Sequence, residues 1–255
     1  MIWPMFPMEQ MLPFAAVVCA GIFVQSATGF AGGLVIIPLM LWAGHGVPEA
    51  QTAMLTATIP QNLLGIFQFR DTINTREMAL PALLRFAAMP VGVATLVYVE
   101  GLPVDAVRQL VGGVVIGCVL LLMYVSPKPR SHVPIQWTLL AFLSSGYFVG
   151  LTGTGGPMMV LWVQAHEWST RKSRSFLFVM YLLSIPPILF MLWFTFGDRV
   201  TRAFCSAVTL IPLLLLVTRI GLQVGTRLGR ERLRRVTMWL LLLIGFLGLI
   251  SPLLR

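Results

Sequence analysis

The chain has 255 residues, of which 57% are hydrophobic and only 11% are charged, and its mean hydropathy is +0.87. A typical soluble domain carries about 25% charged residues, so this chain lacks the polar groups to cover a water-exposed surface. The composition excludes a soluble fold and predicts an all-α polytopic membrane protein covered by the lipid bilayer. The net charge of +9 raises nucleic acid as a partner. Because most Lys and Arg lie between apolar runs, where basic residues mark cytoplasmic loops, we expect no nucleic-acid partner.

Eight apolar runs follow one another along the chain, at residues 12–43, 47–69, 80–99, 107–125, 135–165, 176–196, 204–224 and 236–254. A single helix needs about 20 residues to cross a bilayer, and six of the runs fit one crossing each. The first and the fifth runs are roughly 30 residues long, which is too long for a simple crossing. Each of these two is either a long kinked helix or a re-entrant hairpin that enters and leaves on one side of the membrane.

Loop charges distinguish the two topologies, because Lys and Arg are retained on the cytoplasmic side. If all eight runs cross, seven Lys and Arg fall on one side and nine on the other. If the two long runs are re-entrant, twelve fall on one side and four on the other, namely Arg108, Arg199, Arg202 and Arg255. This bias favours re-entrant hairpins in a multi-pass plasma (inner) membrane protein with both termini outside. Two further arginines lie inside apolar runs and enter neither count.

The two halves of the chain resemble each other. Thr28-Gly29-Phe30-Ala31-Gly32-Gly33 and Thr152-Gly153-Thr154-Gly155-Gly156-Pro157 are similar motifs 124 residues apart. At an offset of 126, matching residues follow downstream, namely Met54, Ile59, Pro60 and Leu63 with Met180, Ile185, Pro186 and Leu189. We expect a first membrane repeat at residues 1–127, a linker at 128–132 and a second repeat at 133–255. Three crossings per repeat would invert the second repeat relative to the first, as in inverted-repeat transporters.

The glycine motifs predict helices that are broken at membrane depth. Broken backbone is tolerated there only where it is buried in protein or lines a wet cavity. Amides at the start of each returning helix can then bind an anion, with Thr hydroxyls as further donors. The alternative is that the glycines only let helices pack closely. The candidate substrate-binding residues are Gln25, Ser26, Thr28, Gly29, Gly32, Gly33, Thr58, Gln61, Asn62, Thr152, Gly153, Thr154, Gly155, Gly156 and Ser184.

Acidic residues and histidines avoid the apolar runs. All nine acidic residues and all three histidines lie in or beside loops, so the sequence offers no obvious proton relay or cation site. Cys19, Cys118 and Cys205 are far apart and lack metal-ligand spacing, so we expect neither a metal nor another cofactor. A membrane enzyme needs clustered His, Asp or Glu at the interface, and the sequence shows none. These absences favour a transporter over an enzyme, a small anionic substrate and simple facilitated efflux.

The chain resembles the TauE/SafE family of sulfite exporters and related permeases over essentially its whole length. The resemblance rests on the glycine motifs at 21–38 and 146–157, and above all on Gly-Leu-Thr-Gly-Thr-Gly-Gly-Pro at 150–157. It includes Gln51-Thr52-Ala53 and Arg174-Ser175-Phe176, which precede the next spans. It implies export of sulfite or small organosulfonates, which we expect to pass through a cavity between the two inverted repeats. The alternative is the membrane subunit of a multi-component ATP-driven permease, and a homo-oligomer is left open.

Overall fold

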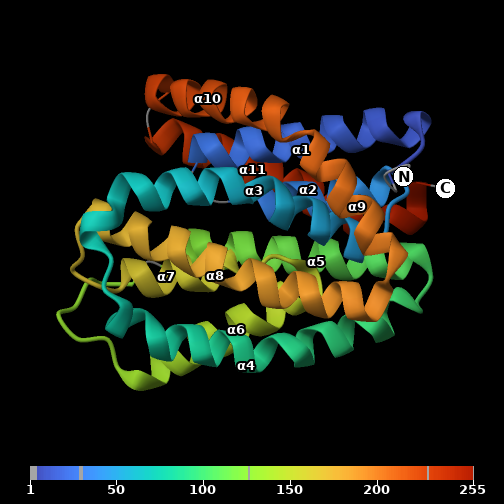
Figure 1. Cartoon of the computed structure of the whole chain (residues 1–255). Coiled ribbons are helices and arrows are strands. Elements are labelled where there is room, and N and C mark those ends of the chain that lie inside the picture. The colour runs from blue at the N-terminus through green and yellow to red at the C-terminus, as the bar shows by residue number, and fades with distance from the viewer. Residues whose placement is uncertain (1–4, 29–30, 126, 229, 255) are drawn as a thin grey trace.

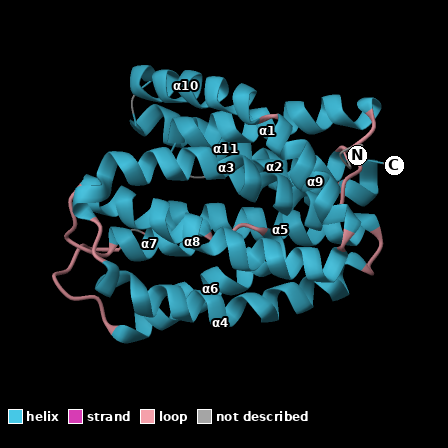
Figure 2. Cartoon of the chain, viewed as in Figure 1, coloured by secondary structure: helices cyan, strands magenta, loops and turns pink. Residues whose placement is uncertain are grey.

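The computed structural model describes residues 5–28, 31–125, 127–228 and 230–254, and at 226, 228, 230–234 and 254 it describes the backbone alone. Helices make up nearly all of the described chain (Figures 1 and 2). An isolated backbone bridge joins Arg130 to His166. The protein is therefore all-α, as its composition predicts.

The helices of the two halves follow the same order. The first half forms α1 (Met8–Thr28), α2 (Gly32–Trp42), α3 (Val47–Phe69), the short 3-10 helix η1 (Arg70–Thr72), α4 (Thr75–Glu100) and α5 (Val104–Tyr124). The second half forms α6 (Ile135–Thr152), α7 (Gly156–Gln164), α8 (Thr170–Phe196), α9 (Asp198–Thr209), α10 (Ile211–Leu228), α11 (Arg230–Leu249) and the 3-10 helix η2 (Ser251–Leu254). In each half, a long helix is followed by a short one across the glycine motif.

Each of these helix pairs is a hairpin. In the first, Gly21 of α1 faces Ile36 of α2, and Gln25 faces Gly32, so α2 runs back along α1 from the break. In the second, Trp162 Nε1 of α7 donates to Thr138 Oγ1 of α6 at 3.0 Å. In each pair, residues further along the second helix contact residues earlier in the first: Gly155 and Trp162 meet Ser145 and Thr138, just as Gly32 and Ile36 meet Gln25 and Gly21, which is the signature of antiparallel packing. The two long apolar runs are therefore hairpins rather than kinked crossings.

The remaining helices run from one end of the bundle to the other. Val47 N at the start of α3 donates to Glu100 Oε1 at the end of α4, at 3.0 Å, so these residues share one end. Lys172 at the start of α8 pairs with Glu77 at the start of α4, at 2.8 Å, so these lie at the other end. The fifth of these segments differs from the single span expected at 204–224, because α9 and the α10 segment to Gly225 are bent by 62°.

Length and hydropathy alone mark five described helices as able to cross a membrane, or six if the bent pair is one span. α3 is not among them, although it has 23 residues. Residues 47–58 of this helix are all buried, so α3 lies inside the bundle and carries polar side chains away from lipid. The chain is a multi-pass membrane protein whose central helix is sheltered by the others.

Glycines set the closest helix contacts. A Cβ on Gly146 of α6 would collide with the backbone of Arg85 in α4, and one on Gly150 would lie 2.5 Å from Met89 O. On the opposite side, a Cβ on Gly225 of α10 would lie 2.6 Å from Ala27 O of α1. Small residues that let backbones approach are the usual means of packing helices in membranes. This packing fixes α4 against the second hairpin and α10 against the first.

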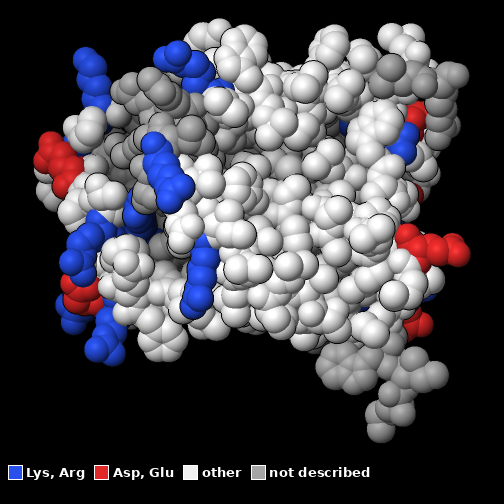
Figure 3. All heavy atoms as spheres, turned by 90° about the horizontal axis from the view of Figure 1, so that it is seen from above, with Lys and Arg blue, Asp and Glu red and all other residues white. Residues whose placement is uncertain are grey.

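Charge separates the two ends of the molecule. Figure 3 shows Lys and Arg gathered at the end where η1 and the start of α8 lie, whereas Asp and Glu prevail at the end that holds both termini. The surface between the ends is largely uncharged in this view. This distribution matches a bundle whose middle faces lipid and whose ends face water.

Candidate functional site

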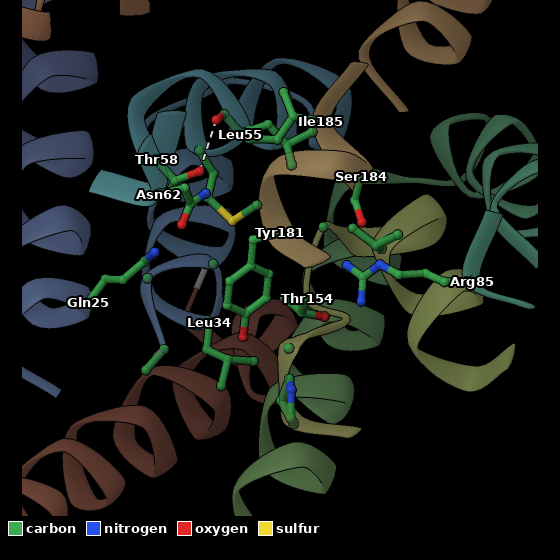
Figure 4. Close-up of a pocket in the computed structure, with 18 residues that line it drawn as sticks. Gln25, Leu34, Leu55, Thr58, Asn62, Arg85, Thr154, Tyr181, Ser184 and Ile185 are labelled. Atoms are coloured by element: carbon green, nitrogen blue, oxygen red, sulfur yellow. Dashed lines mark hydrogen bonds between the residues drawn. The ribbon is translucent and has the colours of Figure 1, made fainter. Parts of the chain in front are cut away.

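The two hairpins meet at their breaks and enclose a cavity with α3, α4 and α8 (Figure 4). The tips are in contact: a Cβ on Gly33 would lie 3.5 Å from Gly153 O and 3.6 Å from Thr154 Cγ2. The cavity has a volume of about 70 Å³. A water molecule occupies about 30 Å³ of liquid, so this space suits an ion of a few heavy atoms.

The backbone turns in the same way at both breaks. Ala31 has φ of 79° and Gly153 has φ of 71°, and both residues line the cavity. Glycine adopts this left-handed conformation without strain, whereas an L-residue loses about 1–2 kcal/mol. The expectation that the glycine motifs break their helices is met in both halves, although in the first half an alanine takes the strained position.

Nine of the fifteen candidate residues line the cavity: Gln25, Gly32, Gly33, Thr58, Asn62, Gly153, Thr154, Gly156 and Ser184. Thr58 and Ser184 turn their hydroxyl protons to their own helices, donating to Leu55 O at 2.9 Å and Met180 O at 2.6 Å. Among the residues described in the cavity wall, this leaves the amides of Gln25 and Asn62 as the main uncharged donors from the predicted set.

Five of the other candidates lie outside the cavity wall. Ser26 packs against Gly221 of α10, and Thr28 donates to Val24 O at 2.8 Å. Thr152 shares a 2.5 Å hydrogen bond with Thr154, while Gly155 O accepts from Ser145 Oγ at 2.5 Å. Gln61 has a buried side-chain oxygen without a described partner. None of these five residues is part of the cavity wall. Gly29 lies outside the described residues.

Arg85 is a cavity residue that the sequence reasoning missed. Its side chain is only 1% exposed, although it lies in the middle of α4. Nη1 donates to Ser145 Oγ and contacts Met159 Sδ at 2.8 Å, and Nε has no partner in the described structure. No ion pair joins Arg85 to a carboxylate of the described chain. The sequence signal was a lone arginine within an apolar run, which by itself marks a functional candidate in a membrane protein.

The second hairpin holds the guanidinium in place. Ser145 accepts from Arg85 and donates onward to Gly155 O, immediately before α7. Gly146 allows α6 to touch the α4 backbone at Arg85 itself. The charge is therefore linked through Ser145 to the break between α6 and α7.

An uncharged donor, the amide of Asn62, lies on the far side of the cavity from Arg85 (Figure 4). Asn62 is 1% exposed, and neither atom of its amide has a partner in the described structure. Tyr181 projects between Asn62 and Arg85, and its hydroxyl lies 2.9 Å from the position of a Cβ on Gly156. The cavity therefore presents a cation on one side and an uncharged amide on the other.

A family model for the sulfite exporters TauE/SafE matches residues 13–247. The chain belongs to the TauE/SafE family. No curated protein and no solved structure matches it significantly. The family comprises membrane exporters of sulfite and related anions, so this chain is a membrane transporter, in agreement with the expectation of a non-enzyme. Within the described residues, no group of three or more His, Cys, Asp or Glu is placed to hold a metal ion.

Proposed function

We propose that this TauE/SafE protein exports a small sulfur oxoanion, such as sulfite or a small organosulfonate, through the cavity between its two hairpins. The observation that carries the proposal is Arg85, a buried cation that lines this cavity with no carboxylate partner in the described chain. An unpaired buried charge costs several kcal/mol. An anionic substrate would remove that cost and would be bound specifically.

Contacts between the halves support an inverted repeat with units at 1–127 and 133–255. α4 packs on α6 in the way that α10 packs on α1, and α5 packs on α11. The first hairpin starts at the end of the bundle that holds Glu100, whereas Arg130, just before the second, bridges to His166 near the start of α8 at the other end. Rocking of two such units about a central site would give alternating access.

The charge distribution supports an orientation with the Lys- and Arg-rich end in the cytoplasm and both termini outside. In a plasma (inner) membrane that is negative inside, an anion of one charge gains about 2.3 kcal/mol per 100 mV when it leaves the cell. Efflux without a coupling ion is then sufficient for export. The proposed partners are the small anion and the lipid bilayer.

The experiment is sulfite flux in liposomes that contain only the purified protein. Arg85→Gln should lose at least about tenfold in rate, because removal of a charged hydrogen-bond partner costs about 1.5–3 kcal/mol. The matched control is Arg219→Gln, a change of the same kind on the exposed side of α10. Equal rates in both variants and the parent protein would refute the proposal. A flux that appears only with an added ATPase would instead support the ATP-driven permease.

A further inference from the structure

We infer that the cavity accepts singly charged oxoanions, so that a sulfur oxoacid crosses as its monoanion, hydrogen sulfite in the case of sulfite. This inference rests on the proposed function and adds the charge state of the substrate. It rests on two observations: the net charge of the side chains that line the cavity, and the hydrogen-bond donors that lie opposite Arg85.

Arg85 is the single ionised side chain among the 18 residues described in the cavity wall. The rest are apolar side chains, glycines, amides, hydroxyls and one Tyr. The described carboxylates that take part in ion pairs lie at the ends of the helices, as Glu49, Glu77 and Glu100 do. The formal charge of the cavity wall is therefore one positive charge.

The helix ends add little to this charge. Each helix terminus behaves as roughly half a charge, positive at the amino end and negative at the carboxyl end. At each break, the carboxyl end of α1 or α6 lies beside the amino end of α2 or α7. The two partial charges have opposite signs at both breaks. The negative end of α1 or α6 therefore offsets the positive potential that we expected from the amino end of α2 or α7. Arg85 then makes the largest contribution to the electrostatic potential in the cavity.

A monoanion therefore neutralises the cavity, whereas a dianion leaves one negative charge buried and uncompensated. Burial of an unpaired charge in a protein interior costs several kcal/mol. A neutral molecule, conversely, would leave Arg85 unpaired. Of the protonation states of a sulfur oxoacid, the singly charged one is thus bound most favourably.

The donors favour an oxoanion over a halide. Arg85 offers its guanidinium from α4, and Asn62 offers an unpartnered, buried amide from α3 on the far side, with Tyr181 between them. Both Arg85 and Asn62 line the cavity of about 70 Å³, which has room for an anion with several oxygens. A halide is a single atom, so it can lie at hydrogen-bond distance from the donors on one side of the cavity only.

The test measures how many charges cross with each sulfite. Purified protein in liposomes is held at a membrane potential of about 60 mV, and sulfite accumulation is read at equilibrium at constant pH on both sides. A single transported charge corresponds to about 2.3 kcal/mol per 100 mV, and therefore to about a tenfold gradient of the carried species. Two charges would give about a hundredfold gradient and would overturn the inference.

Competition provides a second measurement. Chlorate and nitrate, which carry one charge, should inhibit sulfite flux at lower concentrations than sulfate and thiosulfate, which carry two. At fixed total sulfite, the flux should fall as the pH rises and hydrogen sulfite ionises. Arg85→Lys should keep the preference for one charge at a lower rate. Equal inhibition by dianions would refute the charge-state inference alone, whereas the absence of any sulfite flux or anion competition would refute the proposed function itself.

Discussion

Arg199 of α9 donates two hydrogen bonds to Glu49 of α3, from Nε to Oε1 at 2.5 Å and from Nη2 to Oε2 at 2.9 Å. The same Nη2 donates to Glu100 Oε2 at the end of α4, at 2.8 Å. This cluster joins a helix of the second half to two helices of the first. The side chain of Glu49 is only 10% exposed, so this cluster is a largely buried link between α3, α4 and α9 at one end of the bundle.

Replacement of Arg199 by Gln should destabilise the protein by about 1–3 kcal/mol, because it leaves two largely buried carboxylates close together without a cation. The matched control is Arg171→Gln at the other end, where the pair with Asp71 is more than half exposed. Such a surface pair contributes only about 0–1 kcal/mol. Thermal unfolding in detergent measures both variants. An equal loss of stability would contradict a structural role for the Arg199 cluster.

Replacement of Ala31 by Gly should stabilise the protein by about 1 kcal/mol, because glycine adopts the left-handed backbone of this position without strain. The control is Ala87→Gly on an exposed face of α4, where the same change should destabilise by about 0.5–1 kcal/mol. The two variants should therefore shift the melting temperature in opposite directions. Shifts of the same sign would show that the turn at Ala31 is not strained.

Replacement of Gly156 by Ala should reduce transport at nearly unchanged stability, because the added methyl meets the Tyr181 hydroxyl inside the cavity. Gly117→Ala is the matched control: Gly117 is an exposed helix glycine of α5, and a Cβ there meets nothing within 4 Å. We expect at least about a fivefold slower flux for the first variant and normal flux for the second. Normal transport by Gly156→Ala would remove this break from the substrate site.

His45 makes the stability sensitive to acid. It lies in the loop between α2 and α3, 8% exposed, with its ring 4.7 Å from Phe6. Burial lowers the pKa of His45 below its usual value near 6.5, and the nearby Glu49 only partly opposes this shift. When the pKa of a histidine is lower in the folded state than in the unfolded state, its contribution to stability is fully present at a pH above the unfolded-state pKa. This contribution is lost as the pH falls through the folded-state pKa. His45→Phe should therefore weaken the loss of thermal stability below about pH 6. An unchanged pH profile would contradict this role.

The proposed orientation can be tested by cysteine labelling in intact cells, in a background without the native cysteines. A cysteine at Arg130 should be protected and one at Arg202 should react, because Arg130 bridges to His166 near the start of α8, whereas Arg202 lies on α9 at the end that holds Glu100. Equal labelling of both positions would contradict the proposed membrane orientation.

The sequence predicted the hairpins well but the cavity only in part. Gly153 and Gly156 were recognisable because a break at membrane depth demands a special backbone. Thr152 and Gly155 belong to the same motif but lie outside the cavity wall, since Thr152 bonds to Phe148 and Thr154 and Gly155 to Ser145. Arg85 is a lone arginine within an apolar run, which marks it as a functional candidate, but its neighbours along the chain do not show which cavity it lines.

By itself, the sequence determined the all-α membrane class and the separation of charge between the ends, and it favoured hairpins over kinked crossings for the two long runs. These properties follow from composition, from the length of apolar runs and from the positions of Lys and Arg, which are all local along the chain. Only the tertiary structure decided which polar side chains share one cavity, since Gln25, Asn62, Arg85 and Tyr181 belong to four helices. It also decided the bend between α9 and α10. The shared cavity depends on how the helices are rotated and packed against one another, which a run of apolar residues does not encode in any local pattern.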